Sequence, residues 1–438
     1  MATKEPRRSM KGYYITTLLI GLGFFTMGLM DPLYDTYIPI FLGRYIASNA
    51  IIGAIMTIDN AFAIFLIPIF SAISDRTRTR IGRRMPFIIT LLPLSAFSFG
   101  LIPFSALNSL VLLIILIFAL NVFKQAARGP VVALMPDIIP GEIRSEANGV
   151  INTMGGIAAI VGTIGLARLM DVQVNVPGYG KTDNILAFPL AGALVLLAAI
   201  LLILFVREKD GRSREESTEE KVPLIVSLKT IFGEKDKSAL YVLLSLLFWF
   251  IGYQGVLPFV GKYSVEILNT SPGSAALAAG MVGIAYAIFA IPSGIIAHNH
   301  GRKKTIRFAL VCLVLVLLLV FAHSVLLTGE SSSQTMRTVP FWALMFLFGA
   351  FWVTVITNSF PMLWQMASYE NMGIYTGLYY FFSQLASIIA PPLTGALIDI
   401  FGFGSLFVFA AICMAVAFVL MAKVTRGEPE DDAIPIAE

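Results

Sequence analysis

Four polar side chains lie on one face of an otherwise apolar stretch near position 124. They follow the spacing i, i+3, i+4 and i+7, which places all of them along one face of an α-helix: Asn121, Lys124, Gln125 and Arg128. Two amides, an ammonium and a guanidinium can bind hydroxyl groups, and the two cations can pair with a carboxylate. We therefore expect this face to bind a polar solute and to hold an acid that carries a proton.

Three aspartates in two preceding apolar stretches can supply the carboxylates. Asp31 and Asp35 share a helix face, and Asp59 lies in the next stretch. At a rise of about 1.5 Å per residue, Asp59 and Lys124 reach similar depths and can meet near the middle of a membrane. Charges at that depth are costly unless paired or hydrated, so we interpret these residues and Arg128 as a proton-coupling set. Two alternatives remain open: a static Lys124–Asp59 ion pair, and aspartates wetted by solvent at an outer helix end.

The composition places these residues in lipid. The chain is 57% hydrophobic and 13% charged, with a mean hydropathy of +0.82, whereas soluble domains are roughly 45–50% apolar and about 25% charged. Apolar runs long enough to cross a hydrocarbon core of about 30 Å recur along nearly the whole chain. No room is left for a soluble catalytic domain, so we do not expect an enzyme.

Twelve spans account for these runs and predict an all-α integral membrane protein. We place them at 13–43, 48–74, 86–104, 108–137, 142–170, 186–207, 238–268, 272–298, 304–328, 339–368, 372–401 and 404–425. One long polar interval follows the sixth span. This predicts an N-terminal six-helix bundle at 1–207, a cytoplasmic linker at 208–237, and a C-terminal six-helix bundle with a short cytoplasmic tail at 238–438.

Basic residues set the expected orientation, because cytoplasmic loops collect lysine and arginine. They gather at the start of the chain and in the loops after the second and eighth spans, whereas the short loops on the other side hold only Arg44, Lys181 and Arg337. Both termini are therefore expected in the cytoplasm, with the protein spanning a cell membrane, either plasma or inner. The net charge of +4 follows from this bias and implies no nucleic-acid partner. No cofactor or metal is expected either.

The two basic loops are copies of each other. Glycine positions 82 and 301 are 219 residues apart, whereas acid position 75 and its counterpart 298 are 223 apart, so the first copy has four extra residues between them. We expect these loops to act in gating, as a latch between helices of one half; simple anchoring at the inner membrane surface is the alternative. The gating residues are Asp75, Arg76, Arg80, Gly82, Arg83, Arg84, Gly301, Arg302 and Lys303.

The fifth and eleventh spans also correspond. At an offset of 228, Gly149 aligns with Gly377 and Asp171 with Asp399, each aspartate closing its span. Parallel six-helix repeats of this kind place a substrate site near the midplane, between the halves. This organisation resembles the major facilitator superfamily.

The longer first loop makes the resemblance more specific. It reads Ser74-Asp75-Arg76, then Arg80-x-Gly82-Arg83-Arg84-x-Pro86-Phe87-Ile88, and is followed by Arg128-Gly129-Pro130-x-x-Ala133-Leu134-Met135-Pro136-Asp137 and Arg144-Ser145-x-Ala147-Asn148-Gly149. These motifs resemble the glycoside–pentoside–hexuronide:cation symporters, and within them the sucrose-transporter-like branch. The resemblance implies secondary transport of a sugar-like solute, and it covers all twelve spans, with weaker motifs in the second half.

The same resemblance bears on the coupling ion. In sodium-coupled members of that family, acids on the second and fourth helices form the ion site. Here the fourth-helix position is Arg128, and the second-helix positions fall near Ala63 and Ile67, with Asp59 one turn outward. Because an arginine repels a sodium ion, which needs several oxygen ligands, we expect proton coupling instead.

The second half offers aromatic faces and amides, which bind sugars through stacking and hydrogen bonds to hydroxyls. The expected substrate-binding residues there are Trp249, Tyr253, Gln254, Asn358, Tyr380 and Gln384. With Asn121, Gln125 and Arg128 they predict a sugar cavity, although each of them is also a common packing residue.

Three classes of function fit these features. The first is a proton-coupled symporter of a sugar or glycoside that works by alternating access, and we favour it. The second is a proton-driven exporter of drugs or metabolites from the same superfamily. The third is a sensor or scaffold with this fold. We expect the partners to be a small-molecule substrate, protons and the lipid bilayer, with a monomer as the functional unit.

Overall fold

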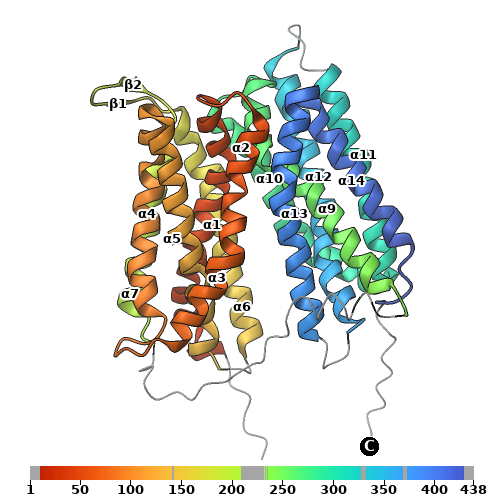
Figure 1. Ribbon diagram of the computed structural model, residues 1–438, viewed down its shortest axis with the longest axis horizontal. Coiled ribbons are helices and arrows are strands. Elements are labelled where there is room, and N and C mark those ends of the chain that lie inside the picture. The colour runs from red at the N-terminus through yellow and green to blue at the C-terminus, as the bar shows by residue number, and fades with distance from the viewer. Residues whose placement is uncertain are drawn as a thin grey trace, which may run out of the picture. The chain divides into compact units, whose positions relative to one another are not determined.

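A computed structural model describes residues 10–140, 143–208, 231, 233, 235–326, 332–367 and 372–428. These residues are almost entirely helical (Figure 1), and twelve of the helical segments among them are long and apolar enough to cross a membrane. The predicted all-α membrane fold with twelve spans is confirmed, and the predicted ends lie within a few residues of the observed ones. Most of the predicted linker lies outside the described residues.

The first six spans contain several helical segments and a short hairpin. After η1 (Met10–Gly12) they are α1 (Tyr14–Gly43), α2 (Asn49–Met56), α3 (Ile58–Arg76), α4 (Met85–Asn108), α5 (Leu110–Ile138), α6 (Arg144–Ile160), η3 (Val161–Leu166), η4 (Ala167–Asp171), β1 (Val174–Val176), β2 (Gly180–Thr182) and α7 (Ala187–Phe205). The last six are α9 (Ser238–Glu266), α10 (Pro272–His300), α11 (Arg302–Leu326), α12 (Gln334–Trp364), α13 (Met372–Phe401) and α14 (Gly404–Ala422).

The second span is interrupted at Thr57, between α2 and α3. Thr57 ends α2, and its hydroxyl donates to the carbonyl of Ala54 at 2.8 Å. Asp59 and Asn60 follow directly, and such short polar side chains compete with the backbone for hydrogen bonds and favour helix starts. The interruption therefore has a local cause in the sequence, and it places Asp59 in the first turn of α3.

The fifth span changes its helical form before it ends at Asp171. α6 passes into the π-helical segment η3 and then into the 3-10 turn η4. Glycines at 155, 156, 162 and 165 weaken the α-helix here, because glycine lacks a side chain and favours many backbone conformations. The hairpin β1–β2 follows, with antiparallel pairing from Val174–Thr182 to Val176–Gly180, and it was not anticipated from the sequence.

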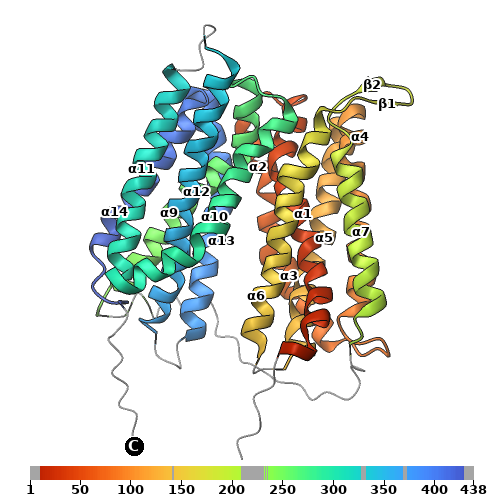
Figure 2. The ribbon, with the colours of Figure 1, turned by 180° about the vertical axis from the view of Figure 1, so that it is seen from behind.

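The chain forms two compact units, which depart from the sequence halves in two segments. Unit 1 contains Met1–Tyr45, Ile58–Ser217 and Ser271–Gly280, and unit 2 contains Ile46–Thr57, Thr218–Thr270 and Met281–Glu438. In unit 1, α1 packs on α5, α6 and α7, and α4 packs on α5 and α7 (Figure 2). In unit 2, α9 packs on α13 and α14, α11 on α12 and α14, and α2 on α13. Each unit thus includes the start of one span from the other half.

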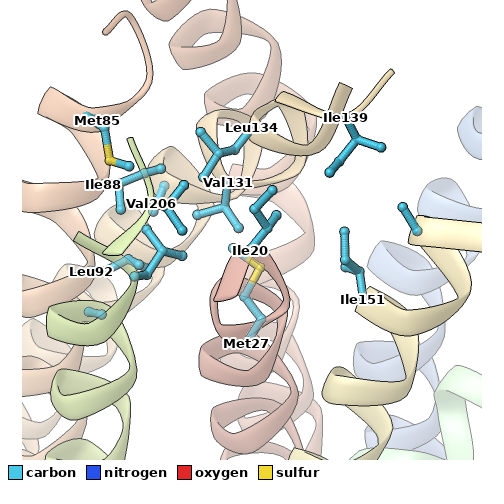
Figure 3. Packing of buried hydrophobic residues seen from close by; sticks show 14 of the residues in the cluster. Ile20, Met27, Met85, Ile88, Leu92, Val131, Leu134, Ile139, Ile151 and Val206 are labelled. Carbon is cyan, nitrogen blue, oxygen red and sulfur yellow. The ribbon is translucent and has the colours of Figure 1, made fainter. Parts of the chain in front are cut away.

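A buried apolar cluster holds unit 1 together at one end (Figure 3). It gathers side chains from α1, α4, α5 and α6, among them Ile20, Leu92, Val131 and Ile151. Helices surrounded by lipid gain little from hiding apolar surface and associate instead by close van der Waals packing at small residues. A Cβ on Gly28 of α1 would lie 2.4 Å from the carbonyl oxygen of Gly155 in α6, so these helices approach as closely as glycine allows.

Candidate functional site

Lys124 is the centre of a buried polar cluster in unit 1. Its Nζ donates to Asp31 Oδ1 at 2.8 Å and lies 5.1 Å from the ring centre of Tyr34. The lysine side chain is 5% exposed and that of Asp31 is 42% exposed, so one partner is enclosed while the other is still reached from outside. The Tyr34 hydroxyl in turn accepts from Asn121 Nδ2 at 2.9 Å. α1 and α5 are therefore joined by an ion pair, a ring contact and a hydrogen bond.

The predicted polar face of α5 is present, but its four members have different surroundings. Asn121, Lys124 and Gln125 are buried, whereas Arg128 is exposed. The Oδ1 atom of Asn121 and the Oε1 atom of Gln125 are buried, and neither has a hydrogen-bond partner among the residues that the structure describes. Buried carbonyl oxygens of this kind usually have a donor, so these two amides are available acceptors on the inner face of α5.

Asp35 and Asp59 lie near the Lys124–Asp31 pair without contacting the lysine directly. Asp59 interacts electrostatically with Lys124, Asp31 and Arg128, and Asp35 interacts with Asp59, Asp31 and Lys124. The structure thus brings together all five residues of the predicted proton-coupling set. The ion-pair partner of Lys124 is Asp31, however, and not Asp59 as we expected from depth along the helices.

Asp59 is held by its own helix start. Its Oδ1 accepts from the backbone nitrogen of Asn60 at 2.6 Å and from Asn60 Nδ2 at 2.8 Å. A carboxylate in the first turn of a helix is also stabilised by the helix dipole. The interruption at Thr57 creates this position, because an unbroken second span would leave Asp59 in mid-helix.

The interior of unit 2 contains a chain of aromatic rings. Tyr253 stacks on Trp352 with centroids 4.0 Å apart and planes 3° apart, and Phe348 lies parallel on Tyr253 at 6.0 Å. Phe250 bridges Trp352 and Tyr379 by edge contacts. We call these rings, with the neighbouring Phe360, Tyr380 and Trp364, the aromatic ladder.

Our sequence reasoning identified Tyr253 and Tyr380 but missed Trp352, which joins the rings. Trp352 lies in the long apolar run of α12, where neither spacing nor charge distinguishes a ladder residue from a lipid-facing one. The other predicted substrate residues are dispersed. Gln254 Nε2 donates to Ser387 Oγ at 2.7 Å, and Asn358 Nδ2 donates to the backbone of its own helix at 2.8 Å.

Trp249 and Gln384 complete the predicted set of unit 2. Trp249 is fully buried, and its Nε1 has no hydrogen-bond partner among the described residues. Gln384 Oε1 is likewise buried and unpaired. Tyr380, in contrast, is 57% exposed. The aromatic and amide groups of this unit therefore range from core positions to an open surface.

The first basic loop contains a dense ion-pair lattice. Arg83 binds both carboxylate oxygens of Asp137, with Nε to Oδ2 at 2.9 Å, and Arg84 Nε reaches the same Oδ2 at 3.0 Å. Arg84 also pairs with Asp75, at the end of α3. The hydrogen bonds that Arg83 donates to Asp137 raise the pKa of Arg83 above its usual value, so this guanidinium stays charged. We call Asp75, Arg83, Arg84 and Asp137 the loop lattice.

Other predicted gating residues lie outside the loop lattice. Arg76 and Arg80 are exposed, and neither forms an ion pair within the described ranges. Gly82 has φ of +107°, a conformation that favours glycine, and a Cβ there would come within 2.2 Å of Glu208. The predicted gating residues of the first loop thus include two paired arginines, two exposed ones and a glycine required by its backbone.

Glu208 is a further residue of the first loop that we did not predict. Its Oε2 accepts from the backbone nitrogens of Arg84 at 2.8 Å and Met85 at 3.2 Å, which caps the start of α4. The second loop repeats this arrangement with Glu428, which accepts from the nitrogens of Arg302 at 2.6 Å and Lys303 at 3.0 Å. The signal lay in the sequence: positions 208 and 428 are 220 apart, nearly the offset of 219 between Gly82 and Gly301.

The second loop has the glutamate cap at the helix start, but among the described residues it has no counterpart of the loop lattice. Arg302 Nη1 donates to the carbonyl of Pro361 at 3.3 Å and to Gln365 at 3.4 Å, and Lys303 Nζ donates to the carbonyl of Ala422 at 3.0 Å. Gly301 has φ of +91°. Within the described residues, the side chains of this loop therefore contact neutral groups where those of the first loop contact carboxylates.

A metal centre is not apparent in the part of the chain that the structure describes. There, no three histidine, cysteine, aspartate or glutamate residues lie close enough together to hold an ion.

Comparison with known proteins identifies the family. The Major Facilitator Superfamily model matches residues 19–271 and 242–437, which together cover most of the chain. The chain belongs to the Major Facilitator Superfamily. It is therefore a multi-pass secondary transporter of a small-molecule substrate, and not an enzyme. None of the curated proteins compared with the chain matches it at a significant level.

Solved structures of other transporters have the same superfamily fold. A mutant of the nucleoside transporter NupG is similar with a TM-score of 0.69 and 12% identity, over 93% of this chain and 100% of that one. A bacterial homologue of the human lysosomal transporter Spinster has a TM-score of 0.68 and 13% identity, over 95% of this chain and 98% of that one. A bacterial metal transporter is similar with a TM-score of 0.64 and 14% identity, over 96% of this chain and 99% of that one. At these identities the likeness establishes the fold alone.

Proposed function

We propose that this superfamily member is a proton-coupled symporter of a sugar or glycoside that works by alternating access. The observation that carries the proposal is the cluster of Asp31, Asp35 and Asp59 around the buried Lys124. With Arg128 as the second cation, three carboxylates face two positive charges, which leaves one negative charge when all are ionised. Uptake of one proton neutralises the cluster, so its protonation can change as access changes.

Recognition of a sugar is supported by the aromatic ladder and the free amide oxygens. Aromatic faces stack on the apolar faces of sugar rings, and amide oxygens accept from hydroxyls. Asn121 and Gln125 offer such oxygens in unit 1, and Gln384 offers one in unit 2. We assign proton coupling to the cluster and substrate contact to these amides, the aromatic ladder and Arg128.

The finer placement of the chain is part of the same proposal. The motifs of the first loop and of α5 support the glycoside–pentoside–hexuronide:cation family, close to its sucrose-transporter-like branch. We propose two six-helix halves at 1–207 and 238–438 with a linker at 208–237, a plasma or inner membrane location, and a monomer as the functional unit. The basic loops support cytoplasmic termini, which labelling of cysteines placed near each end from either side of the membrane would test.

A proton-driven exporter is the alternative. The aromatic ladder also suits flat amphipathic cations, which aromatic faces attract. Efflux of fluorescent cations by cells that make the protein, without pH-driven sugar uptake by the purified protein, would favour that function over the symporter.

The deciding experiment is uptake by purified protein in liposomes, screened with mono- and disaccharides under an imposed pH gradient. We expect accumulation of at least one sugar that requires an inward proton gradient, collapses with a protonophore and is unchanged when choline replaces sodium. Uptake that needs sodium and ignores the pH gradient would overturn the coupling assignment.

Asp59→Asn tests the role of the cluster in the same assay. We expect this variant to lose accumulation while retaining exchange of labelled for unlabelled sugar, because exchange needs no net proton release. Asp183→Asn is the control, since Asp183 is an exposed acid outside the cluster. Retained pH-driven accumulation in Asp59→Asn would remove Asp59 from the mechanism.

A further inference from the structure

Three cations lie at the end of unit 2 where α11 begins and α14 ends. Lys304 and Arg307 belong to the first two turns of α11, and Lys423 is the residue at which α14 ends. Lys304 and Lys423 are exposed, whereas Arg307 is partly covered. All three belong to unit 2, and we call them the basic rim.

The two helices that carry the basic rim pack against each other in a fixed register. α11 and α14 lie side by side (Figure 1 and Figure 2). Lys303 Nζ donates to the carbonyl of Ala422 at 3.0 Å, and the guanidinium carbon of Arg307 lies 4.5 Å from the ring centre of Phe418. Four residues separate the two contacts on each helix, in opposite directions (307 − 303 and 422 − 418). The helices are therefore antiparallel at this end, and their packing holds Arg307 between them.

Arg307 has a donor that nothing in its surroundings satisfies. Its Nε is buried and has no hydrogen-bond partner among the described residues. The Phe418 ring attracts the cation but has no oxygen to accept from an N–H group. Because buried donors usually have an acceptor, Arg307 presents a positively charged donor that still needs one.

The carboxylates described at this end of unit 2 are already engaged elsewhere. Glu428 accepts from the first backbone nitrogens of α11. Asp236 accepts from the backbone nitrogen of Ser238 at 2.7 Å and pairs with Arg426 at 3.0 Å. Within the described residues, neither carboxylate forms an ion pair with the basic rim. This part of the protein therefore leaves the charge of the rim without a counterion.

Exposed apolar side chains continue from the basic rim along both helices. On α11 they follow Lys304 at intervals of four, seven and eleven residues, and on α14 they precede Lys423 at intervals of four and eleven. These side chains are Phe308, Val311, Leu315, Ile412 and Val419. Such intervals place each set on one face of its helix. Each lysine thus stands at the end of an exposed apolar stripe, which suits an acyl chain.

The depth of the cations along α11 matches that of a lipid headgroup. The helix has 25 residues, which is about 37 Å at about 1.5 Å per residue, against a hydrocarbon core of about 30 Å. Lys304 lies about 3 Å and Arg307 about 7.5 Å from the helix start. The cations therefore reach the headgroup layer, while the apolar stripe extends into the core.

The corresponding helix pair of unit 1, α4 and α7, lacks these cations. Lys304 corresponds to Met85 at the offset of 219 between the two loop glycines (304 − 85), and both side chains lie in the first turn of a helix. At the same offset Arg307 corresponds to Ile88 (307 − 88). Met85 and Ile88 are both buried members of the apolar cluster of unit 1. The packing of such a helix pair does not require cations, so those of unit 2 need another explanation.

We propose that the basic rim binds the headgroup of one anionic phospholipid, whose acyl chains lie on the exposed stripes of α11 and α14. The guanidinium of Arg307 donates to two oxygens of the phosphodiester, and the two lysines complete the charge match. A zwitterionic lipid has an ammonium group that the rim repels, so the site distinguishes lipids by charge. In the proposed orientation the rim lies in the cytoplasmic leaflet, which carries anionic lipids. The bound lipid does not contact the solute, so the proposal depends on neither the solute nor the coupling ion.

The test is native mass spectrometry of the purified full-length protein with phosphatidylglycerol or phosphatidylcholine of the same acyl chains. We expect the first phosphatidylglycerol to bind about tenfold more tightly than the first phosphatidylcholine. Arg307→Met keeps an apolar side chain over Phe418 but removes the cation, and it should weaken phosphatidylglycerol binding about tenfold. Lys304→Gln should weaken it about fivefold. Neither variant should change the binding of phosphatidylcholine.

Arg80→Gln is the matched control, because Arg80 is an exposed cation of the first basic loop and lies outside the basic rim. We expect it to change phosphatidylglycerol binding by less than about twofold. Arg307→Lys keeps the charge but loses the planar set of donors, so it should weaken this lipid by only about threefold. A purely structural role of Arg307 would instead weaken both lipids alike in the methionine variant, and that result would overturn the site.

The exposed lysines keep the test decisive if Arg307→Met does not fold, since Lys304→Gln and Lys423→Gln each remove one charge from the surface. A soluble phosphate shares the chemistry of the headgroup, so deacylated headgroup, glycerophosphoglycerol, is added in excess. We expect it to leave the lipid bound; displacement would assign the rim to a soluble anion and overturn the lipid site. Equal binding of the two phospholipids to the wild type would also overturn it. So would a loss in Arg80→Gln as large as in the rim variants, because any exposed cation would then have the same effect.

Discussion

The candidate site residues of unit 1 form a charged cluster, whereas those of unit 2 form a chain of aromatic rings. Lys124 and three aspartates lie inside unit 1, and Tyr253 and Trp352 stack inside unit 2. The basic loops show the same contrast, since Arg84 binds two carboxylates and Arg302 binds neutral oxygens.

The contacts that cap helix starts and the positive-φ glycines, in contrast, are the same in both units. Glu208 and Glu428 cap corresponding helices, Gly82 and Gly301 both have positive φ, and Asp171 and Asp399 bind corresponding helix starts. The two units thus share contacts that define helix ends and differ in the side chains of their interiors. Shared features are therefore expected to serve the fold and its movements, and unshared ones to serve coupling and recognition.

The largest expected effect comes from Lys124→Met. This change leaves Asp31 without its cation, and because Asp31 is 42% exposed the cost in stability is below the about 3–5 kcal/mol of a fully buried pair. We expect accumulation of substrate in liposomes to fall by about 100-fold or more. The double variant Lys124→Met/Asp31→Asn should recover stability but not coupling.

Arg307→Met is the control for that experiment, because Arg307 is a cation of unit 2 that contacts the Phe418 ring at 4.5 Å. It should keep most of the accumulation. Comparable losses in the two variants would mean that coupling is not concentrated in unit 1.

The next effect concerns the two loops. Arg84→Ala breaks two ion pairs, one of them with Asp137, whose side chain is only 7% exposed. We expect a loss of about 3 kcal/mol in the free energy of unfolding, against about 1 kcal/mol for Arg302→Ala, which loses neutral hydrogen bonds. Thermal unfolding in detergent measures both. Equal losses would contradict the contrast between the loops.

The twelve spans could be predicted because the length of an apolar run is a local property. The match between Asp171 and Asp399 could also be predicted, because the duplication left it in the numbering. The partner of Lys124 could not. The rise per residue gives the depth of Asp59 but not the rotation and spacing of helices, and those decide that Asp31 makes the contact.

Other features escaped prediction for physical reasons that differ from one residue to the next. Trp352 has no distinguishing neighbours in its apolar helix. Glu208 acts through backbone nitrogens far away in sequence, so its role shows only in the repeat of the same contact by Glu428, 220 residues later. The interruption at Thr57 had a visible cause in the following Asp59-Asn60 pair, but the long apolar run concealed it.

Alanine substitutions at Gly82 and Gly301 separate the effect of backbone strain at positive φ from the effect of steric contact with the neighbouring glutamate. Gly82→Ala places an L residue at φ +107° and puts its Cβ against the Cβ and carboxylate of Glu208, so it disturbs the cap of α4. Gly301→Ala has comparable strain, but its Cβ meets Glu428 at 3.0 Å. We expect losses of about 3 and about 1.5 kcal/mol in unfolding free energy. A larger loss at Gly301 in thermal unfolding would reverse the inferred order.

The smallest effect is expected at the exposed basic residues, Arg80 in the first loop and Lys304 in the second. Arg80→Ala and Lys304→Ala should each change the unfolding free energy by less than about 0.5 kcal/mol, because exposed charges contribute little to stability. Both should transport at close to the wild-type rate in liposomes of neutral lipid. The two loops would then differ only where an arginine binds a carboxylate. If Arg80→Ala instead destabilises the protein as much as Arg84→Ala, the whole positive charge of the first loop acts as the latch, and the loop lattice is not its specific part.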